Sequence, residues 1–87
     1  MTLEELVAKY IRNTELVFKE MKTLSEAQVT RQKVENVIEY ARNYWKDANY
    51  YRDRNKLETS LASVAYCEGL LDALRLLGLV DFQWPKT

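Results

Sequence analysis

Hydrophobic residues recur at steps of three and four positions along three segments of the chain, the spacing that lines one face of an α-helix. The first stripe comprises Leu3, Leu6, Val7, Tyr10, Ile11, Phe18 and Met21. The second comprises Val34, Val37, Ile38, Ala41, Tyr44, Trp45, Ala48 and Tyr51. The third comprises Leu57, Leu61, Val64, Leu71 and Leu74. The pattern predicts three helices, at about 3–22, 26–53 and 56–77.

Polar residues suited to helix ends stand at the borders of these stripes. Each predicted start carries a pair with the spacing of a capping box, in which two side chains satisfy each other's free backbone amides. The pairs are Thr2–Glu5, Ser25–Gln28 and Asn55–Glu58. Gly78 ends the third helix, because a glycine adopts the left-handed conformation of a Schellman ending without strain.

The connections between the predicted helices are short, around Thr23–Leu24 and Arg54–Asn55. Short connections make neighbouring helices antiparallel. The sequence contains no repeat or low-complexity segment. We therefore predict an all-α, up-down-up three-helix bundle in a single domain, 1–87, followed by an apolar C-terminal tail.

The second connection sets the register between the second and third helices. With a turn near residue 55, facing positions sum to about 110, which places Ala41 opposite Gly69 and Ala48 opposite Ala62. A glycine inside a helix costs about 1 kcal/mol relative to alanine. We interpret Gly69 as a position where the two backbones approach closely.

The composition excludes several classes of protein. The chain has 87 residues, with 13 Lys+Arg, 13 Asp+Glu, no histidine and one cysteine. A lone cysteine forms no internal disulfide, and histidine is the commonest general base and metal ligand. A formal net charge of zero gives no overall attraction to nucleic acid or anionic lipid. We expect no enzymatic activity, no cofactor and no metal.

No segment resembles a targeting or membrane element. The longest uncharged stretch, Thr59 to Cys67, has nine residues, whereas a membrane span needs about 20 apolar ones. The first residues are acidic rather than basic, unlike a signal peptide. We expect a cytoplasmic protein with no membrane partner.

The run from Ala65 to Leu74 reads AYCEGLLDAL. It resembles the AYAEGLLDAL signature of DUF357, an archaeal family of unknown function, with Cys67 in place of an alanine. The resemblance extends over most of the chain. It implies a small helical bundle from an archaeon, found in some proteins beside a nucleotidyltransferase-like domain, and brings no known activity or catalytic residue.

Glu68 and Asp72 lie one helical turn apart, and the predicted register brings Arg42 near Glu68. Our hypothesis is that Glu68 pairs with Arg42 or with a tyrosine hydroxyl while Asp72 faces water, and the alternative is a polar recognition patch made of Arg42, Glu68 and Asp72. An oxygen-only cation site is a third interpretation, but bundle metal sites normally add histidine. Cys67 has no base to ionise it, so we expect a small buried residue rather than a nucleophile.

The residues from 31 to 56 carry seven basic and four acidic side chains, interleaved with aromatic ones. Such a mixture can stack bases and follow a phosphate backbone. Tyr44, Trp45 and Tyr51 fall on the apolar stripe, where we expect them in the core. The basic residues at the turn between the second and third predicted helices form a candidate anion-binding cluster. It comprises Arg52, Arg54 and Lys56.

The tail after Gly78 is strongly apolar. Its hydrophobic residues are Leu79, Val80, Phe82 and Trp84. These side chains either fold back onto the open end of the bundle or form an interface with a second subunit or partner protein.

These features favour a non-catalytic helical protein-interaction module, either a homo-oligomer or an accessory unit for a partner enzyme. A bundle this small has little stability to spare, and self-association is a common remedy. The alternative is a phosphate- or nucleic-acid-binding module that uses the basic turn, and we rank nucleic acid below protein as a partner. Salt separates the two functions, because phosphate contacts weaken as salt rises.

Overall fold

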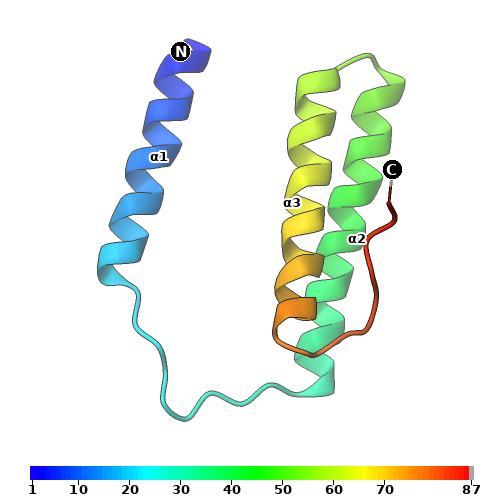
Figure 1. Cartoon of the computed structure of the whole chain (residues 1–87). Helices are drawn as coiled ribbons and strands as arrows, with labels where there is room; N and C mark the ends of the chain where they lie inside the picture. Colours follow the sequence, from blue (N-terminus) through cyan, green and yellow to red (C-terminus); the bar gives the residue numbers. More distant parts are fainter. Residues whose placement is uncertain (87) are drawn as a thin grey trace.

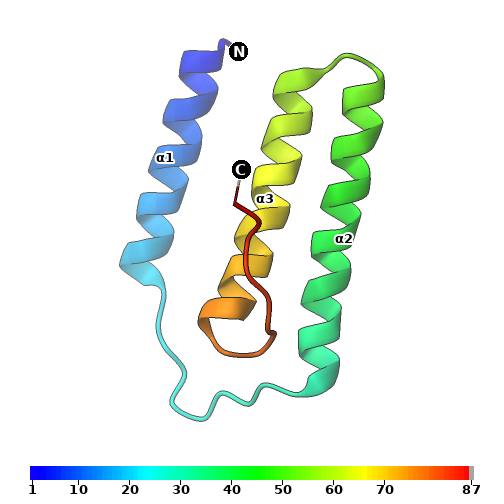
Figure 2. The same cartoon turned by 45° about the vertical axis from the view of Figure 1, so that its right-hand side comes forward.

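The computed structural model describes residues 1–86, in which three helices follow one another (Figure 1). They are α1 (Leu3–Glu20), α2 (Arg31–Asp53) and α3 (Leu57–Leu76). α2 runs antiparallel to both of its neighbours in the two views of Figures 1 and 2. The predicted all-α class and the up-down-up order of three helices are confirmed.

α1 begins as the capping pattern predicts. The Glu5 amide donates to Thr2 Oγ1 at 3.1 Å, and the Thr2 amide donates to Glu5 Oε1 at 3.4 Å. The helix ends at Glu20, two residues before the predicted end, because Met21 adopts an extended conformation (φ −65°, ψ 136°).

The start of α2 differs from the prediction. The capping box at Ser25 and Gln28 is wrong, and residues 21–30 form a linker in place of the short connection expected around Thr23–Leu24. Thr30 caps the helix instead, with its Oγ1 accepting from the Lys33 amide at 3.2 Å. The physical reason is the distance to the apolar stripe. Thr30 lies one turn before Val34, the first residue of the stripe, so the first turn gains packing that a turn at residue 26 would lack.

α2 and α3 form an antiparallel hairpin, and the contact between these two helices is extensive. The Tyr44 and Tyr66 rings lie 4.4 Å apart, and Ser60 Oγ donates to the Ala48 carbonyl at 2.7 Å. These pairs sum to 110 and 108, so the predicted register holds, although Ser60 rather than Ala62 faces Ala48. Small side chains at the contact allow the two backbones to approach. The buried residues are Ala41, Ala48, Cys67 and Leu74.

The predicted N-cap of α3 is wrong, whereas the motif predicted at its C-terminal end is confirmed. At the start, Asn55 is not the cap: it takes the left-handed conformation (φ 58°), and Lys56 is the N-cap without a side-chain bond. Asparagine tolerates this conformation better than most residues. At the end, Gly78 (φ 74°) forms the predicted Schellman motif, in which the Leu79 amide donates to the Leu74 carbonyl at 2.9 Å.

Gly69 does not have the role expected of it. It is exposed, and a Cβ added there would have no neighbouring atom within 4 Å. The close approach of α2 and α3 depends on Ala41 and Ala48, which are 1% and 6% exposed. The register was therefore right to within half a turn, and that half turn moved Gly69 out of the contact.

α1 stands apart from the hairpin (Figures 1 and 2). Within residues 1–86, no Cα of α1 lies within 8 Å of a Cα of α2 or α3, and no residue of α1 itself is buried. The chain exposes 8032 Å², whereas a folded monomer of its 10.3 kDa exposes about 5,400 Å². Its radius of gyration is 15.6 Å, against about 12 Å for a compact chain of this length. A single chain is thus an open structure.

Candidate interaction surfaces

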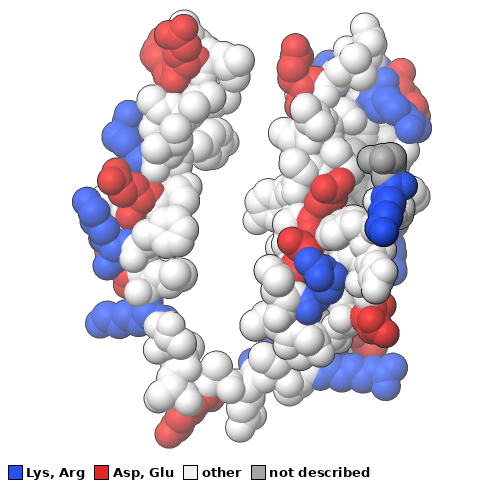
Figure 3. Space-filling model, in the orientation of Figure 1, with Lys and Arg blue, Asp and Glu red and all other residues white. Residues whose placement is uncertain are grey.

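The first candidate surface is the apolar face of α1. Its capping box and the spacing of its hydrophobic residues produce a helix with one apolar side, and Ile11 on that side is 63% exposed. A shallow depression on this face is lined by Tyr10, Ile11, Thr14, Glu15, Phe18 and Lys19. In Figure 3 the charged side chains of α1 gather on the side away from the hairpin, and its uncharged side faces the hairpin. We call this surface the α1 face.

The second candidate surface is a groove between α2 and α3, which we call the hairpin groove. It is lined by Ile38, Ala41, Arg42, Trp45, Cys67 and Leu71. The small residues Ala41 and Cys67 are buried, whereas Trp45 is 54% exposed. The prediction that Trp45 belongs to the core is therefore wrong. In a two-helix layer the apolar stripe of α2 is wider than the contact with α3, and Trp45 falls on its uncovered edge.

The structure separates the predicted polar patch into two parts. Glu68 and Asp72 border one depression, together with Ala65, Gly69 and Trp84. Arg42 lies in the hairpin groove instead. The predicted Arg42–Glu68 ion pair is wrong, because Arg42 Nη1 pairs with Glu39 Oε2 on its own helix at 2.7 Å. A carboxylate one turn away on the same helix is reached at less entropic cost than one on a neighbouring helix.

The C-terminal tail returns along the hairpin (Figures 1 and 2), and Asp72 holds it there. Asp72 Oδ1 accepts from Trp84 Nε1 at 3.1 Å and from Arg75 Nη2 at 2.8 Å. The hydrogen bond from Trp84, followed by that from Arg75, lowers the pKa of Asp72 below its ordinary 3.8. Phe82 packs edge-on against Trp84 with 4.9 Å between ring centroids. We call this arrangement the tail latch.

The tail residues proposed as an interface therefore lie against their own chain. Val80 and Phe82 are half-buried, while Leu79 and Trp84 stay partly exposed. Sequence reasoning did not foresee the bond between Trp84 and Asp72. The available signal was the indole N–H, a donor that needs a partner once the ring packs against protein.

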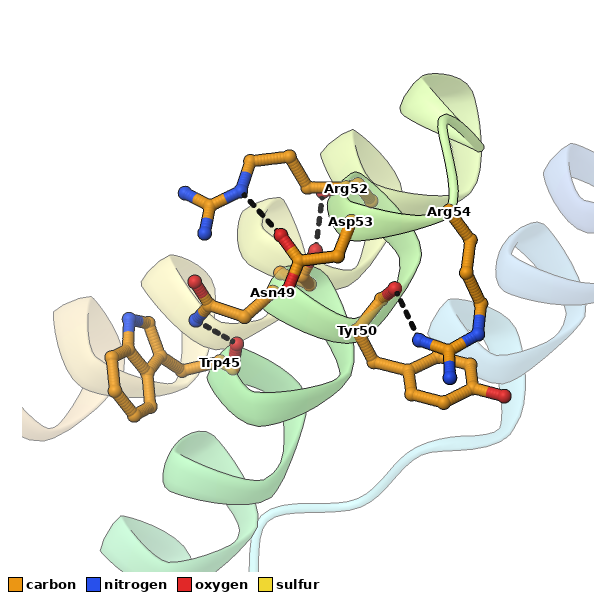
Figure 4. Close-up of polar contacts among 8 residues, drawn as sticks. Trp45, Asn49, Tyr50, Arg52, Asp53 and Arg54 are labelled. Carbon is orange, nitrogen blue, oxygen red and sulfur yellow. Dashed lines mark hydrogen bonds and ion pairs between the residues drawn. The ribbon is translucent and has the colours of Figure 1, made fainter.

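Figure 4 shows Arg52 and Arg54 of the basic cluster at the α2–α3 turn. Arg52 Nε lies 3.4 Å from Asp53 Oδ1. The guanidinium of Arg54 stacks 3.4 Å from the centroid of the Tyr50 ring, and its Nη1 donates to the Tyr50 carbonyl at 3.1 Å. Lys56 is at the start of α3. Two of the three predicted anion-binding side chains thus already interact with groups of α2.

Cys67 is buried, as expected. Burial, and secondarily the charge of Glu68, raises the pKa of its thiol above the ordinary 9.0. Among the residues that the structure describes, no three acidic or cysteine side chains gather in a way that could hold a metal. In the same part of the chain, no helix is both long enough and apolar enough to cross a membrane.

Comparison with protein families gives one match. Residues 9–80 match the sequence model of a family described as "Protein of unknown function (DUF357)". The matched region includes most of α1, the whole hairpin and Gly78, and it ends before Phe82 and Trp84. Comparison with curated proteins and with solved structures found no match.

Proposed function

We propose, starting from the chain's membership of the DUF357 family, that this protein is a non-catalytic, cytoplasmic helical module that binds other protein surfaces. Its contact surfaces are the α1 face and the hairpin groove. The observation that carries the proposal is the position of α1, an amphipathic helix whose apolar side touches neither of the other helices.

The energetics of α1 support an external partner. Most helices in proteins owe their stability to packing of their apolar side rather than to intrinsic helix propensity. α1 has 18 residues, a strong amphipathic pattern and no buried residue within the described structure. The surface beyond that of a compact monomer amounts to about 2,600 Å² per chain. Covering this surface is the simplest way for α1 to gain the stability that its own chain does not supply.

The charge of the molecule favours the same function. Equal numbers of acidic and basic residues give a net charge of zero, so long-range repulsion between copies or towards another protein is weak. The module is either a homo-oligomer or an accessory unit for a partner enzyme, and both forms use the same apolar surfaces.

Small-angle X-ray scattering on the full chain, with mass measured by light scattering, tests the proposal. We expect a mass above that of one chain, or a single chain with a radius of gyration near 15.6 Å. A monomer with a radius of gyration of about 12 Å would overturn the proposal, because α1 would then cover its own hairpin and no apolar surface would be left for a partner.

The alternative function is phosphate or nucleic-acid binding through Arg52, Arg54 and Lys56. The residues from 31 to 56 carry a net charge of +3, which supports it. The contacts of Arg52 with Asp53 and of Arg54 with Tyr50 weigh against it. Association through apolar surfaces should persist at 1 M salt, whereas phosphate binding should fall steeply between about 50 and 200 mM salt.

A further inference from the structure

We infer that the partner of the α1 face is the hairpin groove of a second copy of this chain, and that the two copies exchange their α1 helices in a two-fold symmetric dimer. We call this assembly the exchanged dimer. It rests on the proposed function and specifies the partner.

Both halves of the contact are present on one chain. The α1 face offers the large side chains of Tyr10, Ile11 and Phe18, and the hairpin groove has a floor of small residues, Ala41 and Cys67. Large side chains of one helix pack into spaces between the side chains of another. A two-fold axis pairs each α1 face with the groove of the other copy, so the assembly closes as a dimer and leaves neither of these two surfaces free to recruit further copies.

The borders of the two surfaces are complementary in charge. Glu15 and Lys19 line the α1 face, and the guanidinium of Arg42 lines the groove with Glu39 beside it. Glu15 can meet Arg42 while Lys19 meets Glu39, four residues apart on one helix and three on the other. The flanking charges thus favour one placement of α1 in the groove.

The area to be covered fits a stable dimer. Each chain exposes about 2,600 Å² more than a compact monomer would. Two chains together therefore have about 5,200 Å² to cover, and obligate homodimers bury a total of 2,000 to 5,000 Å² or more. A contact confined to one side chain cluster would leave most of this surface in water. Exchange of the whole of α1 in both directions covers the largest part of it.

The linker gives α1 the necessary reach. Residues 21–30 contain no helix, and the chain is extended at both borders, at Met21 (ψ 136°) and Thr30 (ψ 161°). Ten extended residues span up to about 33 Å. This length lets α1 leave its own hairpin and lie along a neighbouring one, the arrangement of a domain-swapped dimer.

The experiment uses three variants of the full chain. Ile11→Asp places a charge on the α1 face, and Trp45→Lys places one in the groove at an exposed position that spares the hairpin core. Leu16→Asp is the matched control, since Leu16 is 53% exposed on the opposite side of α1. Circular dichroism checks that each variant keeps at least the helix content of the α2–α3 hairpin, and sedimentation across concentration gives the mass.

We expect the unmodified chain and Leu16→Asp to have twice the mass of one chain. Ile11→Asp and Trp45→Lys should each dimerise at least about tenfold more weakly. An equimolar mixture of these two variants should recover the dimer, because the mixed pair contains one intact α1 face opposite one intact groove. Two equal chains of either variant contain no such pair.

Four results would overturn the exchanged dimer. If the mixture stays monomeric while the unmodified chain dimerises, or if Ile11→Asp dimerises as well as Leu16→Asp, the dimer uses another surface. A monomeric unmodified chain with a radius of gyration near 15.6 Å overturns the exchanged dimer but not the proposed function. A compact monomer of about 12 Å overturns both.

Discussion

Gly69 lies inside α3 at a position where the structure provides no reason for a glycine. A Cβ there meets no atom within 4 Å, and glycine lowers helix stability by about 1 kcal/mol relative to alanine. We predict that Gly69→Ala raises the free energy of unfolding by about 0.5–1 kcal/mol, measured by urea denaturation. A loss of stability would contradict the open surroundings of Gly69 and indicate a neighbour on this side of α3.

Gly78 provides the matched control for this substitution. A Cβ at Gly78 also meets no atom within 4 Å, but its φ of 74° is a conformation that other residues adopt at a cost. Gly78→Ala should therefore lower the free energy of unfolding by about 1 kcal/mol. Opposite signs for the two substitutions would show that backbone conformation, and not contacts of the added methyl group, decides the role of each glycine.

The burial and the partners of individual side chains were predictable from the sequence only where a position has few possible neighbours. Ala41, Ala48 and Cys67 are buried as the stripe and the register indicate, because small residues on the contact side of a hairpin have few alternatives. The partner of Arg42 was not predictable. Glu39 and Glu68 were both within its expected reach, and a choice between two carboxylates depends on half a turn of register.

At the scale of elements, the tail latch ties the C-terminal segment to α3 through one carboxylate. The pKa of Asp72 is lowered by its hydrogen bonds to Trp84 and Arg75. A lowered pKa in the folded chain means that the ionised form stabilises the latch. That stabilisation is complete above the ordinary value of 3.8 and is lost as the pH falls through the lower pKa of the latched state.

We predict that the tail stays attached at pH 5 and detaches only below pH 3.8. The indole N–H resonance of Trp84, assigned with a Trp84→Phe variant, reports the change. Asp72→Asn is the control, because it has an amide oxygen as acceptor but no titrating charge, and its resonance should not move in this range. A transition centred at or above 3.8 would contradict the hydrogen bonds seen at Asp72.

The elements themselves were largely predictable, and the one that was not has a local explanation. The hairpin and the Schellman ending at Gly78 follow from the spacing of hydrophobic residues and from a glycine placed just after the last turn. The linker was not predicted because Ser25 and Thr30 are both residues that can cap a helix, and Ser25 with Gln28 has the spacing of a capping box. The choice between them is made by packing on the hairpin, which a local pattern does not reveal.

At the scale of the whole molecule, the sequence indicates that α1 has an apolar partner but not which one. An amphipathic stripe has the same pattern whether it packs on its own chain, on a second copy or on another protein. The exposed surface of 8032 Å² and the radius of gyration of 15.6 Å depend on how the three helices of one chain are placed in space. They distinguish an open chain from the closed bundle that the stripes alone would suggest.

Coupling between folding and association gives the last prediction. If α1 is ordered only in the exchanged dimer, each tenfold rise in protein concentration stabilises the folded state by about 1.4 kcal/mol. The melting temperature of the unmodified chain should then rise by about 3–6 °C for each tenfold increase, followed by circular dichroism between 1 μM and 100 μM. Leu16→Asp should behave in the same way, whereas Ile11→Asp, which dimerises more weakly, should melt at a lower temperature than Leu16→Asp at each concentration. A concentration-independent melting temperature for the unmodified chain would show that α1 draws no stability from a second copy.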